Sequence, residues 1–263
     1  MSSPWVQHHY GEAFRIFDDP VLSSWLGKLC AKDTQGPLIH ELIKRIYRHL
    51  IARVLAAEGA ASETEIPTRM VDLHPQAGLL RTRGVSVSQR AICVNLARAG
   101  TVPSQICYEE LNYLLNPAGV RQDHIGIARQ SSESTHHVTG SHVSGHKIGG
   151  DLKEALVLFP DPMAATGSTM VEIMNLYRSL EGAKSAKFVA IHCIVTPEYL
   201  QRVAREAPEL RVYAVRVDRG LSPPEVLALA PGTKWSQEKG LNDHDYIVPG
   251  GGGFGEILNN AYV

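Results

Sequence analysis

The sequence predicts an α/β fold with a mostly parallel central sheet flanked by helices. Apolar runs of strand length alternate with segments of helical periodicity along most of the chain, and this alternation is typical of parallel sheets covered by helices on both faces. The 263 residues, 44% hydrophobic and 20% charged, are enough for one such domain with a full core. No internal repeat and no linker composition indicates a second domain.

The first segment, residues 1–35, is expected to be an N-terminal arm that packs on the body or on a neighbouring subunit. Its aromatic residues stand among polar ones: Trp5, Tyr10, Phe14 and Phe17. The longest predicted helix follows at 37–57, because Pro37 suits a first turn, Gly59 comes after the end, and apolar residues recur at helical spacing.

Two short strands at 65–73 and 79–87 are expected to form a hairpin around residues 74–78. The β-then-α alternation follows. It predicts strands at 91–97, 123–129, 154–160, 186–195 and 211–217, and helices at 104–115, 170–180 and 197–207. Thr196 and Pro197 have the character of an N-cap and a first turn, and Pro208 would stop that helix.

Residues 154–170 carry the clearest functional pattern, a buried strand that ends at Asp161 and passes through a small-residue turn into a helix. The turn, residues 166–169, places backbone N–H groups and hydroxyls at a helix N-terminus, where unpaired donors and the helix dipole favour a phosphate. Asp161 lies at the carboxyl end of its strand, where open α/β sheets bind ligands. A plain Ser/Thr helix cap is the simpler alternative for the turn alone.

Composition excludes several classes of protein. Lys and Arg number 26 and Asp and Glu 27, so the charge balance argues against a nucleic-acid partner. The four cysteines form no Cys-x-x-Cys pair, which suits a reducing cytoplasmic setting and offers no zinc site. We also expect no membrane partner and no signal peptide, since no apolar run approaches the roughly 18 residues of a membrane span.

Two further features suggest ligand contacts. Arg98 follows an apolar strand, and a guanidinium there can pair bidentately with a diphosphate, although a surface ion pair is the alternative. The polar stretch 130–150 contains four imidazoles: His136, His137, His142 and His146. These could bind a transition metal, but no acid or cysteine completes such a site, so we favour a role beside an anionic ligand.

The segment 161–169, Asp-Pro-Met-Ala-Ala-Thr-Gly-Ser-Thr, resembles the phosphoribosyl-diphosphate (PRPP) signature of type I phosphoribosyltransferases. Its Asp-Pro-Met opening is similar to that of uracil phosphoribosyltransferases. Residues 240–250 resemble the segment with which that family holds uracil, and residues 96–100 and 124–129 match in the family's order. The resemblance covers most of residues 36–255.

This resemblance implies a type I phosphoribosyltransferase fold over residues 36–263, with a small hood formed by parts of 60–90 and 219–255. It implies transfer of a phosphoribosyl group from PRPP to uracil, giving UMP and pyrophosphate for pyrimidine salvage in the cytoplasm. Mg²⁺ would be the cofactor, and the chain would form a homodimer or higher homo-oligomer. GTP activation, known in some members, cannot be inferred from this sequence. The alternative is a divergent homologue that binds PRPP or a nucleotide but uses another base or turns over little uracil.

The resemblance also assigns residues. PRPP would be bound by Arg98, Arg129, Asp161, Pro162, Met163, Ala164, Ala165, Thr166, Gly167, Ser168 and Thr169. Arg98 and Asp161 would be the catalytic residues, with Asp161 also the metal ligand, and stretch 130–150 would be a mobile lid over PRPP. Uracil would be bound by Tyr246, Ile247, Gly252, Gly253 and Phe254, largely through their main chain.

The sequence departs from the family pattern in four places. Gly253 stands where the family has an acid that contacts PRPP, and Phe254 replaces a small residue and is expected to narrow the base pocket. The stretch after Arg129 lacks the family's acidic and aromatic residues, and residues 219–239 are additional. Glu256 is a candidate substitute for the missing acid, but the sequence does not place it.

Overall fold

The computed structural model describes residues 3–131 and 138–259. Within these residues one eight-stranded sheet runs in the order β1-β10-β9-β7-β4-β5-β6, with the short β8 beside β9. The strands are β1 (Phe14–Ile16), β4 (Ala91–Ala97), β5 (Val120–Ser131), β6 (Val138–Lys147), β7 (Leu156–Pro160), β8 (Met163–Ala164), β9 (Lys187–Val195) and β10 (Leu210–Val217). All neighbours pair in parallel except β5 and β6, which form an antiparallel hairpin. The predicted mostly parallel α/β fold is confirmed.

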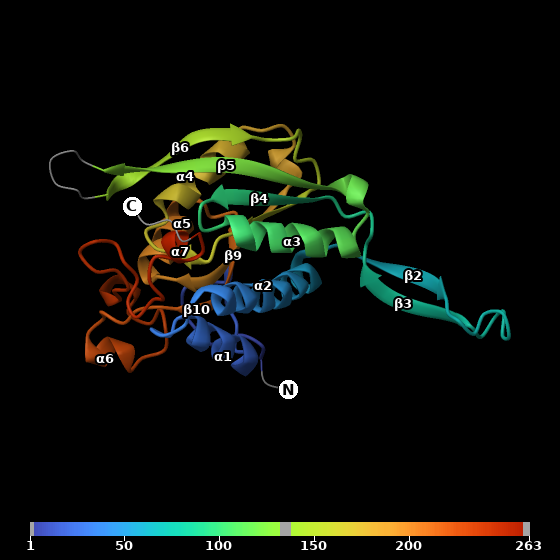
Figure 1. Cartoon of the computed structure of the whole chain (residues 1–263), viewed down its shortest axis with the longest axis horizontal. Helices are drawn as coiled ribbons and strands as arrows, with labels where there is room; N and C mark the ends of the chain where they lie inside the picture. The colour runs from blue at the N-terminus through green and yellow to red at the C-terminus, as the bar shows by residue number, and fades with distance from the viewer. Residues whose placement is uncertain (1–2, 132–137, 260–263) are drawn as a thin grey trace.

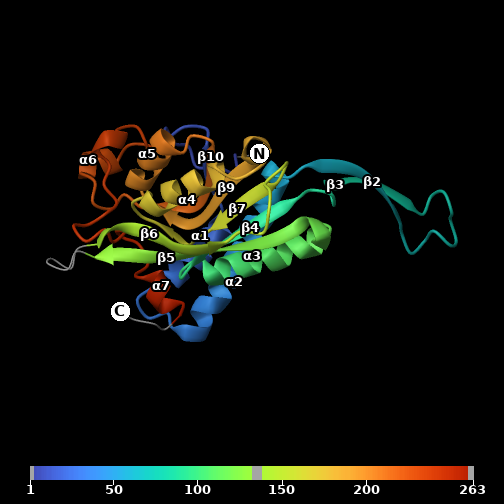
Figure 2. The same cartoon turned by 90° about the horizontal axis from the view of Figure 1, so that it is seen from above.

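Helices cover both faces of this sheet (Figures 1 and 2). Helices α1 (Pro20–Leu29), α2 (Gly36–Glu58) and α3 (Thr101–Leu114) share one buried cluster, and α4 (Ser168–Arg178) and α5 (Pro197–Glu206) share the other. Along β7, Leu156 and Leu158 belong to the first cluster and Val157 and Phe159 to the second, as the period of two in a strand requires. Because both faces are buried, β7 reads as a continuous apolar run.

The N-terminal segment packs on the body of its own chain, which is one of the two arrangements expected for it. Strand β1 extends the sheet by pairing with β10, and α1 packs on α2. Tyr10, Phe14 and Phe17 are buried in the core. The aromatic residues of this segment therefore fill space within its own chain.

The predicted hairpin exists as β2 (Ala61–Pro67) and β3 (Leu79–Val85), a separate two-stranded sheet. Its first strand begins at Ala61 instead of residue 65 and ends at Pro67 instead of residue 73. It ends there because the N–H and the hydroxyl of Thr68 both donate to the Gly78 carbonyl and close the loop. The hairpin projects from one end of the molecule, whereas the chain after β10 lies at the opposite end (Figures 1 and 2). The two segments expected to share a hood are thus far apart.

The added residues after β10 contain α6 (Pro224–Leu227) and a 3-10 turn, η3 (Trp235–Gln237), and the chain closes with α7 (Phe254–Ile257). Two other 3-10 turns are η1 (Pro117–Gly119) and η2 (Ala183–Ser185). No helix among the described residues is both long and apolar enough to cross a membrane.

Candidate active site

The segment 161–169, called the phosphate turn below, connects β7 to α4 at the carboxyl edge of the sheet. Gly167 is the N-cap of α4 and has φ = 80°, a left-handed conformation that glycine adopts without strain. A Cβ atom there would lie 3.3 Å from Tyr199 Cδ2 and 3.4 Å from Arg202 Cβ, so the neighbouring α5 also restricts this position. The predicted strand, turn and helix therefore occur in the expected order, with a glycine where the backbone requires one.

The phosphate turn presents main-chain donors. The first amides of any α-helix lack intrahelical acceptors, and at this helix end the Ser168 N–H makes a long hydrogen bond of 3.5 Å to the Thr166 hydroxyl oxygen. The Thr166 and Ser168 hydroxyl oxygens lie 3.0 Å apart at the same helix end. Amides, hydroxyls and the positive end of the helix dipole converge there, which is the arrangement that suits a phosphate.

A buried threonine fixes this turn. The Thr196 hydroxyl donates to the Ala165 carbonyl (2.6 Å) and accepts from the Tyr199 N–H (3.0 Å). It thus caps α5 and holds the phosphate turn with one oxygen atom. The sequence identifies Thr196 as a cap. Its bond to Ala165 could not be predicted, because it depends on the packing of β9 beside β7 in the folded sheet.

Asp161 follows β7 and is only partly exposed. Burial raises the pKa of its carboxyl to about 7, and a hydrogen bond from the Met163 N–H opposes this shift. Its backbone carbonyl lies 2.6 Å from His192 Nδ1, while His192 Nε2 lies 2.8 Å from the Tyr199 hydroxyl. A carbonyl can only accept, so Nδ1 carries the proton and Nε2 accepts from Tyr199.

Burial lowers the pKa of His192 to about 4, with the bond to the Asp161 carbonyl acting in the opposite direction. The neutral imidazole is therefore a structural support beneath Asp161 at ordinary pH. Neither His192 nor Tyr199 was predicted as part of the site. His192 lies inside an apolar strand, and a buried polar residue in such a run is the only signal that could have indicated it.

Arg98 lies at the same edge of the sheet, directly after β4, which neighbours β7. Gly100 permits this approach, because a Cβ atom there would come within 2.9 Å of the Pro160 carbonyl oxygen. The Ala97–Arg98 peptide is cis. The Arg98 side chain is 44% exposed, and its Nη2 lies 3.7 Å from Glu256 Oε1.

Arg129 lies in β5, where its backbone pairs with Ser141 of β6. Its side chain lies outside the described residues, as do His136 and His137 and the side chain of His142. The polar stretch expected to be a lid forms the β5–β6 hairpin on either side of residues 132–137. Among the described residues no group of three or more His, Cys, Asp or Glu side chains could hold a metal.

Residues 240–254, called the base segment below, are held by side chains from the body of the protein. Gly250 is bound on both sides: its N–H donates to Asp218 Oδ2 (2.7 Å) and its carbonyl accepts from Arg216 Nη2 (3.1 Å). Asp218 and Arg216 are themselves paired, with 2.8 Å between Oδ2 and Nη2. The Glu198 carboxylate accepts from the Gly240 N–H (2.9 Å) and so fixes the other end of the segment. None of these three side chains was predicted from the sequence.

The main chain of the base segment is sharply folded. Gly250 and Gly252 have φ values of 61° and 87°, which glycine tolerates, and the Val248–Pro249 peptide is cis. Ile247 pairs with Leu241 in an isolated antiparallel bridge, and about half of the Tyr246 side chain is exposed.

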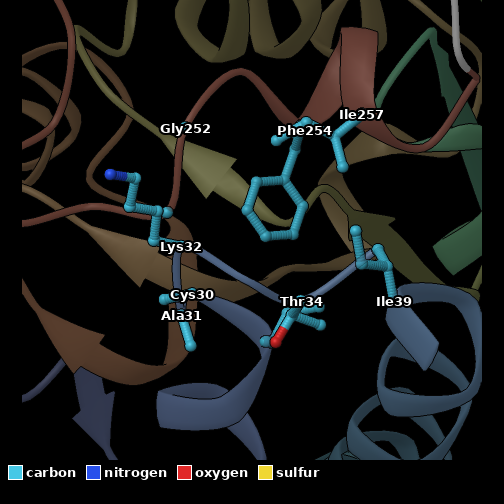
Figure 3. A pocket seen from close by; sticks show the side chains of 10 residues that line it. Cys30, Ala31, Lys32, Thr34, Ile39, Gly252, Phe254 and Ile257 are labelled. Carbon is cyan, nitrogen blue, oxygen red and sulfur yellow. The ribbon is translucent and has the colours of Figure 1, made fainter. Parts of the chain in front are cut away.

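Phe254 is buried, and its ring lies between the base segment and the α1–α2 connection (Figure 3). It borders a cavity of about 240 Å³ between these two parts of the chain. Thr34, Ile39 and Ile257 line the same cavity, and a Cβ atom at Gly251 would lie 2.8 Å from the ring. Phe254 therefore anchors α7 in the core.

The added residues 219–239 fasten the base segment to the N-terminal segment. Arg219 forms an ion pair with the buried Glu238 (2.9 Å), which also accepts from the Tyr10 hydroxyl (2.5 Å). The Trp235 ring packs edge-on against Tyr10 and donates its N–H to the Pro197 carbonyl. The insertion is thus a packed connection between both ends of the chain.

A comparison with protein families matches residues 16–234 to the family model described as uracil phosphoribosyltransferase. The chain belongs to this family. The match ends before the base segment, but alignments with individual relatives extend further. Uracil phosphoribosyltransferases of Dictyoglomus turgidum (26% identical over 245 residues; 92% of this chain and 97% of that protein) and of a Geobacillus species (27% over 244 residues; 92% and 96%) are similar over nearly their full lengths.

Among solved structures, the AQ2163 protein of Aquifex aeolicus aligns with a TM-score of 0.69 and 22% identity over 95% of this chain and 99% of that one. This likeness shows a shared fold. Together with the family match, it confirms the type I phosphoribosyltransferase fold for this member of the uracil phosphoribosyltransferase family. Family and fold support PRPP-dependent phosphoribosyl transfer.

Proposed function

We propose that this protein transfers the phosphoribosyl group of PRPP to uracil, forming UMP and pyrophosphate in pyrimidine salvage. The observation that carries the proposal is the phosphate turn, where Gly167 opens α4 and Thr196 fixes the Ala165 carbonyl at the carboxyl edge of the sheet. The nearby Arg98 supplies a cation for the diphosphate. The reaction needs no covalent nucleophile, so positioning and electrostatic stabilisation suffice.

In this mechanism the phosphate turn holds the 5′-phosphate through its amides and hydroxyls. Asp161 holds the ribose hydroxyls, and Arg98 stabilises the charge that grows on the leaving pyrophosphate. The ring nitrogen of uracil forms a bond to the anomeric carbon while the bond from that carbon to the pyrophosphate oxygen breaks, with inversion, and the proton of that ring N–H passes to the departing pyrophosphate. The base segment presents folded main chain to uracil, whose alternating carbonyl and N–H groups can pair with backbone groups.

Asp161 also fits a magnesium ion bound mainly by substrate. Mg²⁺ in such sites keeps several waters and takes one or two carboxylates plus phosphate oxygens, and Asp161 offers one partly exposed carboxyl at this edge. When bound, the ion would neutralise charge on the pyrophosphate. We therefore propose Mg²⁺ as the cofactor, supplied with PRPP.

Transfer to a different base is a second candidate. It is favoured by the departures from the family pattern at Gly253 and Phe254, within the segment expected to bind uracil. The phosphate turn and the base segment therefore need separate tests.

A panel of radiolabelled bases incubated with PRPP and Mg²⁺ distinguishes the two candidates. Formation of UMP with uracil as the preferred base supports the first, and preferential use of another base supports the second. Calorimetry of PRPP binding tests the shared premise: we expect Mg²⁺-dependent binding that Asp161→Ala weakens. Absence of PRPP binding to the wild-type protein would refute both.

We further propose that the protein forms a homodimer or larger homo-oligomer. The β2–β3 hairpin supports this, since an isolated two-stranded sheet is marginally stable alone and this one exposes Ile66, Met70, Leu73 and Leu80. Sedimentation of the wild-type protein and of a Leu73→Ser/Leu80→Ser variant tests it. A monomeric wild-type protein would contradict the proposal.

A further inference from the structure

The carboxylate of Glu256 occupies the space beside Gly253, where any other residue would place its side chain. A Cβ atom built on Gly253 would collide with Glu256 Oε2 and lie 3.2 Å from Glu256 Cδ. The two positions are three residues apart, at the N-cap and in the first turn of α7. Only a residue without a side chain at 253 allows the Glu256 carboxylate to lie where it does.

The same carboxylate faces Arg98. Glu256 Oε1 lies 3.7 Å from Arg98 Nη2, a charge–charge contact longer than a direct hydrogen bond between such groups. The Glu256 side chain is 14% exposed and that of Arg98 44% exposed, so the acid is the more shielded member of the pair. A partly shielded carboxylate beside a guanidinium restricts the directions in which that cation can point.

Helix α7 fixes the carboxylate in this place. Phe254 and Leu258 are buried in the core cluster beneath the helix. The Glu256 and Ile257 amides both donate to the Gly253 carbonyl and close the first turn. Phe254, the large residue expected to narrow the base pocket, therefore anchors the helix that presents Glu256.

We propose that Glu256 is a positioning residue for PRPP, holding Arg98 toward the pyrophosphate from the space that Gly253 leaves open. This inference rests on the proposed function and deepens it. It depends on Gly253, because a side chain at that position would displace the Glu256 carboxylate from its place beside Arg98. A simpler role for Glu256, as a first-turn acid that stabilises α7, predicts a loss of stability alone.

The test compares Glu256→Gln, Glu256→Ala and the relocation variant Gly253→Asp/Glu256→Ala by PRPP calorimetry, steady-state kinetics and thermal unfolding. We expect Glu256→Gln to raise the KM for PRPP about tenfold, to leave the KM for the base within twofold, and to keep the wild-type Tm. The relocation variant should recover at least half of the PRPP affinity that Glu256→Ala loses. Glu225→Gln, which changes an exposed first-turn acid of the equally short α6, is the matched control.

The outcomes separate the two proposals. Wild-type PRPP binding combined with an unchanged KM for PRPP in folded Glu256→Gln overturns the inference and leaves the proposed function standing. A relocation variant that folds but binds PRPP no better than Glu256→Ala also overturns it. Failure of the wild-type protein to bind PRPP overturns both.

Discussion

The phosphate turn and the base segment lie at the same end of the protein, but they are fixed by different means. In the phosphate turn, a strand, a left-handed glycine and a helix follow one another within residues 156–178, and the body adds one uncharged contact, from the Thr196 hydroxyl to the Ala165 carbonyl. In the base segment, the main chain is held by charged side chains from the body, namely Asp218, Arg216 and Glu198. The difference implies that phosphate binding and base binding respond to mutations in different parts of the chain.

The largest expected effect comes from Asp218→Ala, which breaks the link between the base segment and the sheet. Asp218 is 2% exposed and pairs with Arg216 and the Gly250 N–H. The substitution leaves the Gly250 N–H and the partly exposed Arg216 without this partner, and leaving a buried group unsatisfied costs about 1–3 kcal/mol, more for a charged group. We expect a matching loss in chemical denaturation and a KM for the base at least tenfold higher, with PRPP affinity in calorimetry nearly unchanged.

Glu58→Ala is the control for that variant. Glu58 is also buried and binds Arg211 and Tyr213, but at the start of β10, on the opposite edge of the sheet. It should lower stability without changing either KM. Equal losses of PRPP and base binding in Asp218→Ala would show that the two regions are not independent.

Thr196→Val should weaken PRPP binding and leave base binding intact, which is the opposite of the pattern expected for Asp218→Ala. The substitution keeps the shape of the side chain but removes the oxygen that binds the Ala165 carbonyl and the Tyr199 N–H. Leaving these buried groups unsatisfied costs about 1–3 kcal/mol. We expect weaker PRPP binding in calorimetry and an unchanged KM for the base. Thr233→Val, which removes an exposed hydroxyl bond to Ala230, should change neither.

Gly167→Ala should have a smaller effect on the same turn. A non-glycine residue in the left-handed region costs about 1–2 kcal/mol, and a Cβ atom would also press on Tyr199. A turn that relaxes to relieve this strain must regain the binding conformation when PRPP binds, and since about 1.4 kcal/mol corresponds to a factor of ten, PRPP affinity should fall by up to roughly tenfold. Gly11→Ala imposes a positive φ on alanine in open space and should leave PRPP affinity intact. A tighter-binding Gly167→Ala would contradict the backbone account of this site.

The smallest effect is on the pH dependence of stability, where two neighbouring groups oppose each other. Asp161, with its pKa raised from 3.8 to about 7, binds a proton in the folded state that the unfolded state has lost, so its contribution falls as pH rises between those values. His192 has its pKa lowered from 6.5 to about 4, so the unfolded state binds a proton that the folded state has lost. Its contribution to stability therefore rises as pH rises between about 4 and 6.5. The two slopes should nearly cancel in the wild-type protein.

Replacing either residue alone should reveal how the remaining one makes the free energy of unfolding depend on pH. The free energy of unfolding of Asp161→Asn, measured with urea, should rise with pH over this window relative to the wild type. That of His192→Asn should fall relative to the wild type. Parallel pH profiles for all three proteins would show that neither pKa is shifted as described.

The sequence predicted correctly the elements whose formation depends on neighbouring residues in the chain. The fold class, the strand at β7 and the start of α5 at Thr196 and Pro197 follow from apolar runs, caps and proline positions. The role of His192 beneath Asp161 and of Asp218 beneath Gly250 did not follow, because those contacts join strands and loops that only the folded sheet brings together. For the same reason the sequence could name Glu256 as a candidate acid but could not place it.

The expectation for Phe254 illustrates a second limit. Its position beside the base segment suggested a narrower pocket, but side-chain direction is set by packing, and the ring turns into the core. The N-terminal segment is similar: its aromatic residues predicted burial correctly, but the sequence could not show that β1 joins the sheet through β10.

That pairing has a consequence for how the chain is made. Phe14 pairs with Val212, so β1 is synthesised long before the strand that it joins in the sheet. Tyr10 likewise meets Glu238 only after 228 further residues have been synthesised. Contacts of such long sequence separation form slowly, and domains generally fold as units during translation. An affinity tag fused ahead of β1 should therefore slow the late pairing of β1 with β10.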